Sequence, residues 1–386
     1  MRSAILTPDA YLRAVSLRDL TDPAAGPHAM QRLIDAIREA LAARWGCEVR
    51  THRAHPVVPL EHNYDRLHYP PDGAARDARY TRYVSETTVL RSHSTAMVPS
   101  ALARASADPP RDLLLMCPGL VYRRDQIDRL HTGEPHQMDL WRVALRRLDE
   151  RDLREMVDTV ISAALPGAEY RITPSPHPYT LAGVQMDVRA DGDWVEVGEC
   201  GLALPAILDE AELPSARWSG LAMGVGLDRL LMLAKGIDDI RLLRSADPRI
   251  AAQMLDLAPY QAVSSQPAVR RDLSVAVEAS RTPEELGDRV RQALGEQVES
   301  LESVEVLSET EYDAMPAIAR QRIGMELGQK NVLVRIVIRD LVRTLTSAEA
   351  NRLRDAVYAS LHEGRAWQWA DAPVAAVPAE GFSGSP

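Results

Sequence analysis

The sequence predicts an α+β fold, and three observations support this prediction. Residues 112–143 have the pattern of two strands joined by a long polar loop. Residues 28–45 place their apolar side chains on one helical face. Residues 267–364 are predicted to follow a β-α-β-β-α-β order. A chain of 386 residues with these elements is expected to form two or three domains.

The composition limits the class of protein. The cysteines Cys47, Cys117 and Cys200 lack the spacing of zinc ligands, so neither a zinc site nor a disulfide framework is expected. No apolar run approaches ~18 residues and the N-terminus lacks a signal-peptide pattern, which predicts a soluble, cytoplasmic protein without membrane contact. The formal net charge of −10 argues against a general nucleic-acid-coating protein. A local basic face would still be sufficient for phosphate contacts.

The first 60 residues divide into a leader, a helix and an extended segment. Residues 1–27 are expected to be a short leader, with a turn at its proline- and glycine-rich end. The next segment, His28–Trp45, is predicted to be a helix, and an extended segment then reaches Pro56 and Pro59. The apolar face of the helix consists of Met30, Leu33, Ile34, Ile37 and Leu41.

Charged side chains gather in the stretch Gly119–Trp141. The apolar run before it, Asp112–Cys117, is expected to be broken by Pro118-Gly119, and His136–Val143 alternates polar and apolar residues as a strand on the floor of a cleft would. Four polar side chains are placed to converge on one small polyanion: Arg123, His131, Gln137 and Asp139. A solvated hairpin, with these charges directed at water, remains the alternative.

A second stretch, Ser219–Ile240, combines a Gly-x-Gly sequence with a predicted helix. Asp228 and Arg229 follow the glycines, and the apolar helical pattern continues through Leu230, Leu231, Leu233 and Ile237. Glycines before a helix allow a ligand to approach the backbone, and an arginine at the helix start can meet a phosphate.

Together these stretches resemble motifs two and three of the class II aminoacyl-tRNA synthetases, with phenylalanyl-tRNA synthetase as the nearest type. Four further stretches agree with that family in order and approximate spacing: His62–Leu67, Leu90–Thr95, Pro174–Val188 and Trp194–Gly201. The resemblance implies a catalytic domain over 28–245, built on an antiparallel sheet flanked by helices. It also likens residues 28–60 to motif one, which commonly lies at a dimer interface, so a homodimer is expected; an ordinary core helix is the alternative.

The resemblance implies activation of an amino acid with ATP and Mg²⁺. A carboxylate attacks the α-phosphorus and pyrophosphate leaves, so anionic partners must be positioned and neutralised. Arg123 is expected at the α-phosphate and the carboxylate, Arg229 at the γ-phosphate, and His131 over the phosphates. The other residues of the implied ATP site are Glu196, as the ligand for magnesium or an ATP hydroxyl, and Asp125 and Asp228, where the family has Glu.

The resemblance also implies an amino-acid pocket. Gln137 and Asp139 are expected to face the substrate ammonium, and His93 and Thr95 lie in a run that matches a family motif. The family's Phe-Pro-Phe falls at His177-Pro178-Tyr179. The remaining expected pocket residues are Glu199, Gly201, and Leu221, Ala222 and Met223, where the family has Phe-Ala-Phe.

These pocket positions lack the phenylalanines of the family. A buried His or Tyr tip demands a hydrogen-bond partner, which phenylalanine does not supply. The preferred amino acid is therefore expected to differ from plain phenylalanine and to carry a polar group facing His177 or Tyr179, with Glu199 as an unusual carboxylate nearby. Drift at constant specificity is the alternative, because the whole chain contains a single phenylalanine, Phe382.

A second resemblance covers the C-terminal part. After a linker at 246–266, residues 267–364 resemble the ferredoxin-fold anticodon-binding domain of phenylalanyl-tRNA synthetases, as in the organellar single-chain enzyme. This segment has 13 basic and 17 acidic residues, a net charge of −4, which makes it a poor phosphate ligand overall. Residues 365–386 are expected to be a disordered tail.

Two functions are compatible with these sequence features. The first is a synthetase that activates an aromatic amino acid and transfers it to tRNA. The second is a synthetase-derived paralogue that adenylates a different amino acid for a non-tRNA acceptor, or that binds tRNA or senses an amino acid without charging. A non-enzymatic scaffold is disfavoured, because the site residues would have no reason to be retained together.

Overall fold

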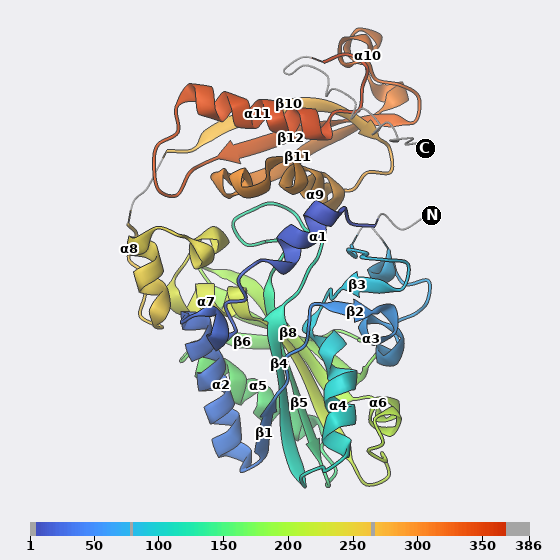
Figure 1. Ribbon diagram of the computed structural model, residues 1–386, viewed down its shortest axis with the longest axis vertical. Coiled ribbons are helices and arrows are strands. Elements are labelled where there is room, and N and C mark those ends of the chain that lie inside the picture. Colours follow the sequence, from blue (N-terminus) through green and yellow to red (C-terminus); the bar gives the residue numbers. More distant parts are fainter. Residues whose placement is uncertain (1–4, 78–79, 264–266, 368–386) are drawn as a thin grey trace, which may run out of the picture. The chain divides into compact units, whose positions relative to one another are not determined.

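The structure is a computed structural model that describes residues 5–77, 80–263 and 267–367. The chain forms two compact units, Met1–Ser265 and Gln266–Pro386. The predicted α+β class is confirmed, because both units combine antiparallel strands with helices (Figure 1). Within the described ranges, no helix is long and apolar enough to cross a membrane.

The first unit is built on a seven-stranded sheet with the order β1-β4-β5-β9-β8-β7-β6. Strands β1 and β4 run parallel, and every other neighbouring pair is antiparallel. The strands are β1 Glu48–Thr51, β4 Asp112–Leu120, β5 His136–Ala144, β6 Tyr170–Pro174, β7 Thr180–Ala190, β8 Asp193–Ala203 and β9 Ser219–Gly226. A separate two-stranded sheet pairs β2 Val57–Pro59 with β3 Thr88–Leu90.

Helices cover both faces of the large sheet (Figure 1). One face carries α2 Ala29–Trp45, α5 Glu150–Ala164 and α7 Leu227–Lys235, which contact one another. The other face carries α4 Val98–Ser106 and α6 Pro205–Glu210, whose apolar side chains share a core with Trp141 and Ala222. The predicted apolar face of α2 is confirmed, since all five of its predicted side chains are buried.

Strand β4 corrects the expected break at Pro118-Gly119. The strand continues to Leu120, and Pro118 pairs with Met138 of β5. On its other side β4 pairs with β1 only from Leu113 to Met116. Pro118 therefore lies where β4 has lost its β1 partner, so its missing backbone N–H disrupts no ladder hydrogen bond.

The expected leader is packed onto the first unit. Helix α1, Pro8–Val15, buries Ala14 against Leu120 and Tyr122, and the backbone N–H of Leu6 donates to the Tyr83 carbonyl. Further along, the Leu20 N–H donates to His136 Nε2 at 3.1 Å. Residues 5–27 therefore belong to the packing of the first unit.

The second unit contains a three-stranded antiparallel sheet with the order β10-β12-β11. Helices α9 and α11 contact each other, and α11 also contacts β10. Both helices begin with capping boxes, at Thr282 with Glu285 and at Thr346 with Glu349. The elements are β10 Val269–Glu278, α9 Pro283–Leu294, β11 Leu301–Glu311, α10 Ala317–Ile323, β12 Gln329–Ile338 and α11 Ser347–Leu361.

The second unit differs from the predicted element order in two ways. Helix α10 lies between β11 and β12, where a direct strand connection was expected. Within residues 267–367, no strand follows α11, so the last strand of the predicted order is not found there. The predicted tail beyond residue 367 lies outside the described residues.

Candidate active site

The candidate site lies on the face of the sheet formed by the middle strands β5, β9 and β8. Their register places Asp139, Gly224 and Glu199 in one row and Trp141, Ala222 and Gly201 in the next. Side chains two residues apart on a strand share a face, so both rows face the same side. A Cβ added to Gly224 would meet only Asp139 Oδ2, at 3.7 Å. The floor between Asp139 and Glu199 is therefore open.

Two predicted pocket residues lie on the opposite face. Leu221 pairs with Arg142, and Met223 pairs with Leu140. The Arg142 guanidinium lies 4.1 Å from the centre of the Trp45 ring on α2, which identifies this as the face covered by α2, α5 and α7. The prediction was wrong for Leu221 and Met223, because strand alternation lets only Ala222 of the three face the site.

One end of the site is rich in arginine, and we call Arg123, His131, Glu196 and Arg229 the cationic end. The Nε of Arg123 is buried and has no hydrogen-bond partner among the described residues. Burial lowers the pKa of Arg123, while the charges of Asp125 and Glu196 oppose this shift. A buried guanidinium with an unused N–H is suited to accept an anion.

Arg229 is held by two contacts at the start of α7. Its Nη1 donates to the Glu196 carbonyl at 2.8 Å, and its Nη2 lies 3.3 Å from His131 Nε2. His131 Nδ1 lies 2.8 Å from Asp128 Oδ2, and this hydrogen bond raises the pKa of His131. The neutral tautomer with its proton on Nδ1 satisfies both neighbours, donating to Asp128 and accepting from Arg229.

The carboxylate of Glu196 is the exposed member of the cationic end. Partial burial and the nearby Glu199 raise its pKa, while Arg229 and Arg123 oppose the shift. Asp125 lies near enough to raise the pKa of Arg123. Among the residues that the structure describes, no group of three or more His, Cys, Asp or Glu side chains could hold a metal ion. Glu196 therefore offers one carboxylate to a metal and no complete protein site.

The structure contradicts the expected ATP contact of Asp228. Its carboxylate accepts from the His136 backbone N–H and lies 2.8 Å from His136 Nδ1. Burial would raise the pKa of Asp228, but its interactions with His136, which include two hydrogen bonds, and the charge of Arg244 outweigh burial and lower it. Asp228 is only 5% exposed. It fixes the start of β5 to the start of α7 and does not face an open space.

The Asp139 carboxylate is likewise buried, and three side chains donate hydrogen bonds to it. Its Oδ2 accepts from the Ser94 hydroxyl at 2.6 Å and from the Thr95 hydroxyl at 3.1 Å, and its Oδ1 accepts from Trp141 Nε1 at 3.1 Å. Burial raises its pKa to about 6. The Gln137 Oε1 accepts from the Ser94 backbone N–H at 3.3 Å. Asp139 and Gln137 thus anchor residues 94–95 beside the open floor.

Aromatic rings line the other end of the site. The Tyr69 ring stacks on His93 at 5.5 Å and lies 6.2 Å from Tyr179, which in turn stacks on Trp141 at 6.3 Å. Neither ring nitrogen of His93 has a hydrogen-bond partner among the described residues. Burial, with repulsion from Arg123, lowers the pKa of His93 to about 4, so the ring is neutral.

A histidine–carboxylate pair borders the same aromatic rings. His177 lies between β6 and β7, and its Nε2 is 2.7 Å from Glu199 Oε2 on β8. The His177 ring centre lies 5.9 Å from that of Tyr179. Gly201, in the neighbouring row, is required by packing, because a Cβ there would lie 2.7 Å from the Thr180 Cβ. We call Tyr69, Tyr179, His177, Glu199 and Ala222 the aromatic end.

Sequence reasoning missed Tyr69, Ser94 and Trp141. Tyr69 follows the noted stretch His62–Leu67 by two residues, and Trp141 closes the central stretch, so both were within reach of the motifs. Ser94 lies between two predicted site residues, but its bond to Asp139 joins positions 45 residues apart. Only the folded chain brings these donors to Asp139.

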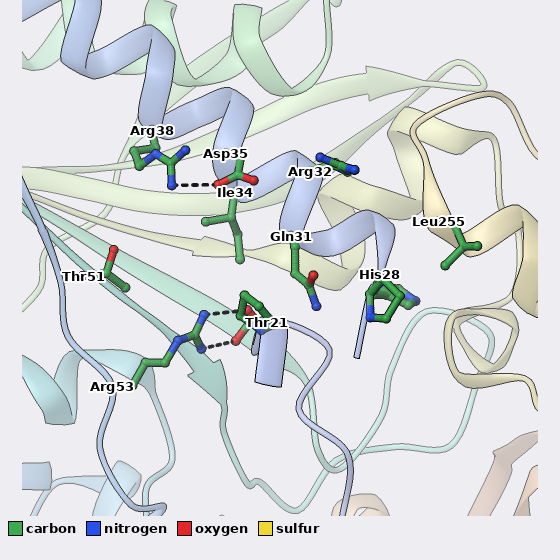
Figure 2. A pocket seen from close by; sticks show the side chains of 12 residues that line it. Thr21, His28, Gln31, Arg32, Ile34, Asp35, Arg38, Thr51, Arg53 and Leu255 are labelled. Atoms are coloured by element: carbon green, nitrogen blue, oxygen red, sulfur yellow. Dashed lines mark hydrogen bonds and ion pairs between the residues drawn. The ribbon is translucent and has the colours of Figure 1, made fainter. Parts of the chain in front are cut away.

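A separate cavity of about 400 Å³ lies beside the start of α2 (Figure 2). Its wall includes Thr21, His28, Gln31 and Arg53, and none of the predicted site residues lines it. The Arg53 guanidinium donates to the Thr21 carbonyl and hydroxyl, which fixes the segment before α2. This cavity is therefore formed by residues 21–53 together with Leu255, away from the predicted site.

Known proteins match the part of the chain that forms this site. The family model of the class II core domain of tRNA synthetases (F) matches residues 14–254. The phenylalanine–tRNA ligase alpha subunit of Prochlorococcus marinus is 33% identical over 237 residues, which cover 61% of this chain and 69% of that protein. The corresponding subunit of Nostoc punctiforme is 31% identical over 192 residues, which cover 50% of this chain and 57% of that protein.

Proposed function

Because the chain belongs to the class II tRNA synthetases, we propose that it activates an aromatic amino acid with ATP and transfers it to tRNA, as a phenylalanine–tRNA ligase-like enzyme. The observation that carries this proposal is the cationic end beside an open glycine floor. The buried Nε of Arg123 has no hydrogen-bond partner among the described residues, and Gly224 leaves open space on the sheet between Asp139 and Glu199.

The proposed first step joins two anions. A carboxylate oxygen of the amino acid forms a bond to the α-phosphorus of ATP, and the bond from that phosphorus to the pyrophosphate oxygen breaks. Positioning and charge neutralisation supply most of the rate, since both partners are negative. Arg123 would bind the α-phosphate and the carboxylate. Arg229 would bind the γ-phosphate, and His131, in the loop beside Arg229, would lie over the phosphates.

Magnesium would arrive with ATP. Mg²⁺ usually binds phosphate oxygens and waters with one or two protein carboxylates, so the single carboxylate of Glu196 fits this role. The ion would neutralise phosphate charge. The backbone carbonyl of Glu196 also accepts from Arg229 Nη1, so the two residues would meet the phosphates side by side.

The second unit is proposed to bind the anticodon part of tRNA in the cytoplasm. Support comes from its antiparallel sheet and its two capped helices, while its net charge of −4 over 267–364 predicts weak, localised phosphate contacts.

We further propose that residues 28–60 bind a second copy of the chain. Light scattering of the purified protein tests this; a monomer would contradict it.

The acidic second unit favours one other candidate function. A paralogue could form the adenylate and pass the amino acid to an acceptor other than tRNA. The two functions separate cleanly in a filter assay with total tRNA. Adenylate formation without charged tRNA would favour the paralogue, and charged tRNA would reject it.

The proposal is tested by ATP–pyrophosphate exchange over a panel of amino acids without tRNA. The wild-type chain should exchange with at least one aromatic amino acid. Arg123→Ala should lower exchange by at least ~100-fold, because the variant loses a donor at the reacting phosphate. Arg151→Ala, which removes an exposed arginine of α5, is the matched control and should leave exchange unchanged. Unchanged activity of Arg123→Ala would contradict the proposed site.

A further inference from the structure

The pair formed by His177 and Glu199 is the feature of the aromatic end that the proposed chemistry does not use. Glu199 stands in the row of Asp139 and Gly224, on the open side of the floor. His177 reaches Glu199 from the turn between β6 and β7 and lies against Tyr179. Both side chains therefore border the space between the open floor and the aromatic rings.

The chemistry of the pair leaves Glu199 able to accept a further hydrogen bond. A carboxylate only accepts, so the short contact requires the proton on His177 Nε2. The other oxygen, Oε1, has the Ser175 hydroxyl at 3.4 Å, near the limit for a hydrogen bond. The Glu199 side chain is 37% exposed. Its remaining acceptor capacity is therefore open to a donor that enters the pocket.

The negative charge of Glu199 acts on the two tyrosines of the aromatic end. After burial and the Asp139 charge, Glu199 is a further cause of the raised pKa of Tyr69, and it contributes to the raised pKa of Tyr179. Both phenols are therefore held protonated beside a carboxylate. An aromatic side chain that enters this space meets ring faces on one side and a carboxylate on the other.

We propose that the His177–Glu199 pair makes this pocket select an aromatic amino acid that carries a hydrogen-bond donor on its ring, such as a hydroxyl or amino group, over phenylalanine. The proposal rests on the proposed adenylation activity. A donor on the ring would form a hydrogen bond with Glu199, whereas a phenyl ring would cover the carboxylate and leave this acceptor unsatisfied. Selectivity of about tenfold to 100-fold is expected from one such group.

A competing role for Glu199 is to bind the substrate's α-ammonium. That group is common to all amino acids, so loss of Glu199 would then lower activity with every substrate by the same factor. If Glu199 instead binds a donor on the substrate ring, its loss would change activity with donor-bearing substrates and with phenylalanine by different factors. The ratio of kcat/KM values between two substrates therefore separates the two roles.

The experiment is ATP–pyrophosphate exchange with phenylalanine, tyrosine, 3-hydroxyphenylalanine and 4-aminophenylalanine. The wild-type chain should show a kcat/KM at least ~10-fold higher for the best donor-bearing substrate than for phenylalanine. Glu199→Gln should lower that ratio by about tenfold, and the double variant His177→Phe with Glu199→Gly should reverse it. Retained exchange with phenylalanine shows that each variant is folded.

The matched control is Glu210→Gln, which alters another histidine–carboxylate pair, with His68 at 3.0 Å, outside the pocket. It should leave the ratio unchanged. A wild-type preference for phenylalanine, or an equal loss with every substrate in Glu199→Gln, would overturn the inference and leave the proposed function standing. Absence of exchange with any amino acid would instead reject the proposed function, and the inference with it.

Discussion

The cationic end and the aromatic end of the site hold their charged groups differently. At the cationic end, the buried Nε–H of Arg123 has no partner within the described part of the chain, and Arg229 is held by a carbonyl and a histidine. At the aromatic end, Glu199 is paired with His177. The first end presents positive charge for an incoming anion, and at the second the carboxylate already has a hydrogen-bond partner. We infer that the cationic end supplies the shared chemistry and that the aromatic end sets which amino acid enters.

The largest expected effect tests the cationic end alone. Arg229→Ala should raise the KM for ATP, or lower kcat, by roughly 100-fold, because it removes a charged donor from the phosphates. The KM for the amino acid should change little. Steady-state exchange kinetics with each substrate varied separately would measure both values. Equal increases in the KM values for ATP and for the amino acid would mean that Arg229 contributes to the binding of both substrates.

The next effect tests the open floor of the aromatic end. Gly224→Val should raise the KM for the amino acid by roughly tenfold or more, because its side chain would fill the space between Asp139 and Glu199. Thermal unfolding should be nearly unchanged, since an added Cβ meets only one atom within 4 Å. A fully active variant would show that the substrate lies elsewhere.

A pH effect tests whether Asp139 is structural. Its pKa of about 6 lies above that of an unfolded aspartate, ~3.9, so the native state holds an extra proton between these values. Stability should therefore fall as the pH rises from about 4 to 6, by at most ~3 kcal/mol for this group. Asp139→Asn should flatten that part of the profile. Urea unfolding at pH values from 4 to 8 measures the free energy of unfolding. If Asp139→Asn leaves the pH dependence of that free energy unchanged, Asp139 is not buried with a raised pKa.

The smallest effect tests which face Met223 occupies. Met223→Leu should cost less than ~1.5 kcal/mol and leave the kinetics for every amino acid unchanged, because the side chain faces the helices. Ala222→Gly, by contrast, should widen the aromatic end and alter the kcat/KM ratio between large and small aromatic substrates. A specificity change in Met223→Leu would place that residue in the pocket after all.

Local patterns were sufficient to predict much of the first unit. The apolar face of α2 and the two strands around the loop after Leu120 depend on neighbouring residues, and the structure confirms them. The placement of Asp228 could not be predicted in this way, because its partner His136 is 92 residues away. A carboxylate at a helix start suits an exposed site and a buried pair equally well, and only tertiary packing decides between them.

Strand alternation explains why the prediction for Leu221 and Met223 was wrong. Residues 221, 222 and 223 cannot all face one pocket if they form a strand. The sequence analysis assigned no strand to Ser219–Gly226, because it interpreted the glycines only as residues that let a ligand approach the backbone before a helix. Once the strand is known, the alternation assigns Ala222 to the site and its two neighbours to the helix side.

His136 has a consequence for how the chain is made. Its ring accepts from Leu20 and pairs with Asp228, so it joins three segments that leave the ribosome at different times. At about 5–20 residues per second, Leu20 would wait roughly 10–40 seconds until Asp228 is synthesised. During that interval the early segment lacks its final anchor. The first unit therefore completes this junction only late in translation, and slower synthesis would lengthen the exposure of its N-terminal segment.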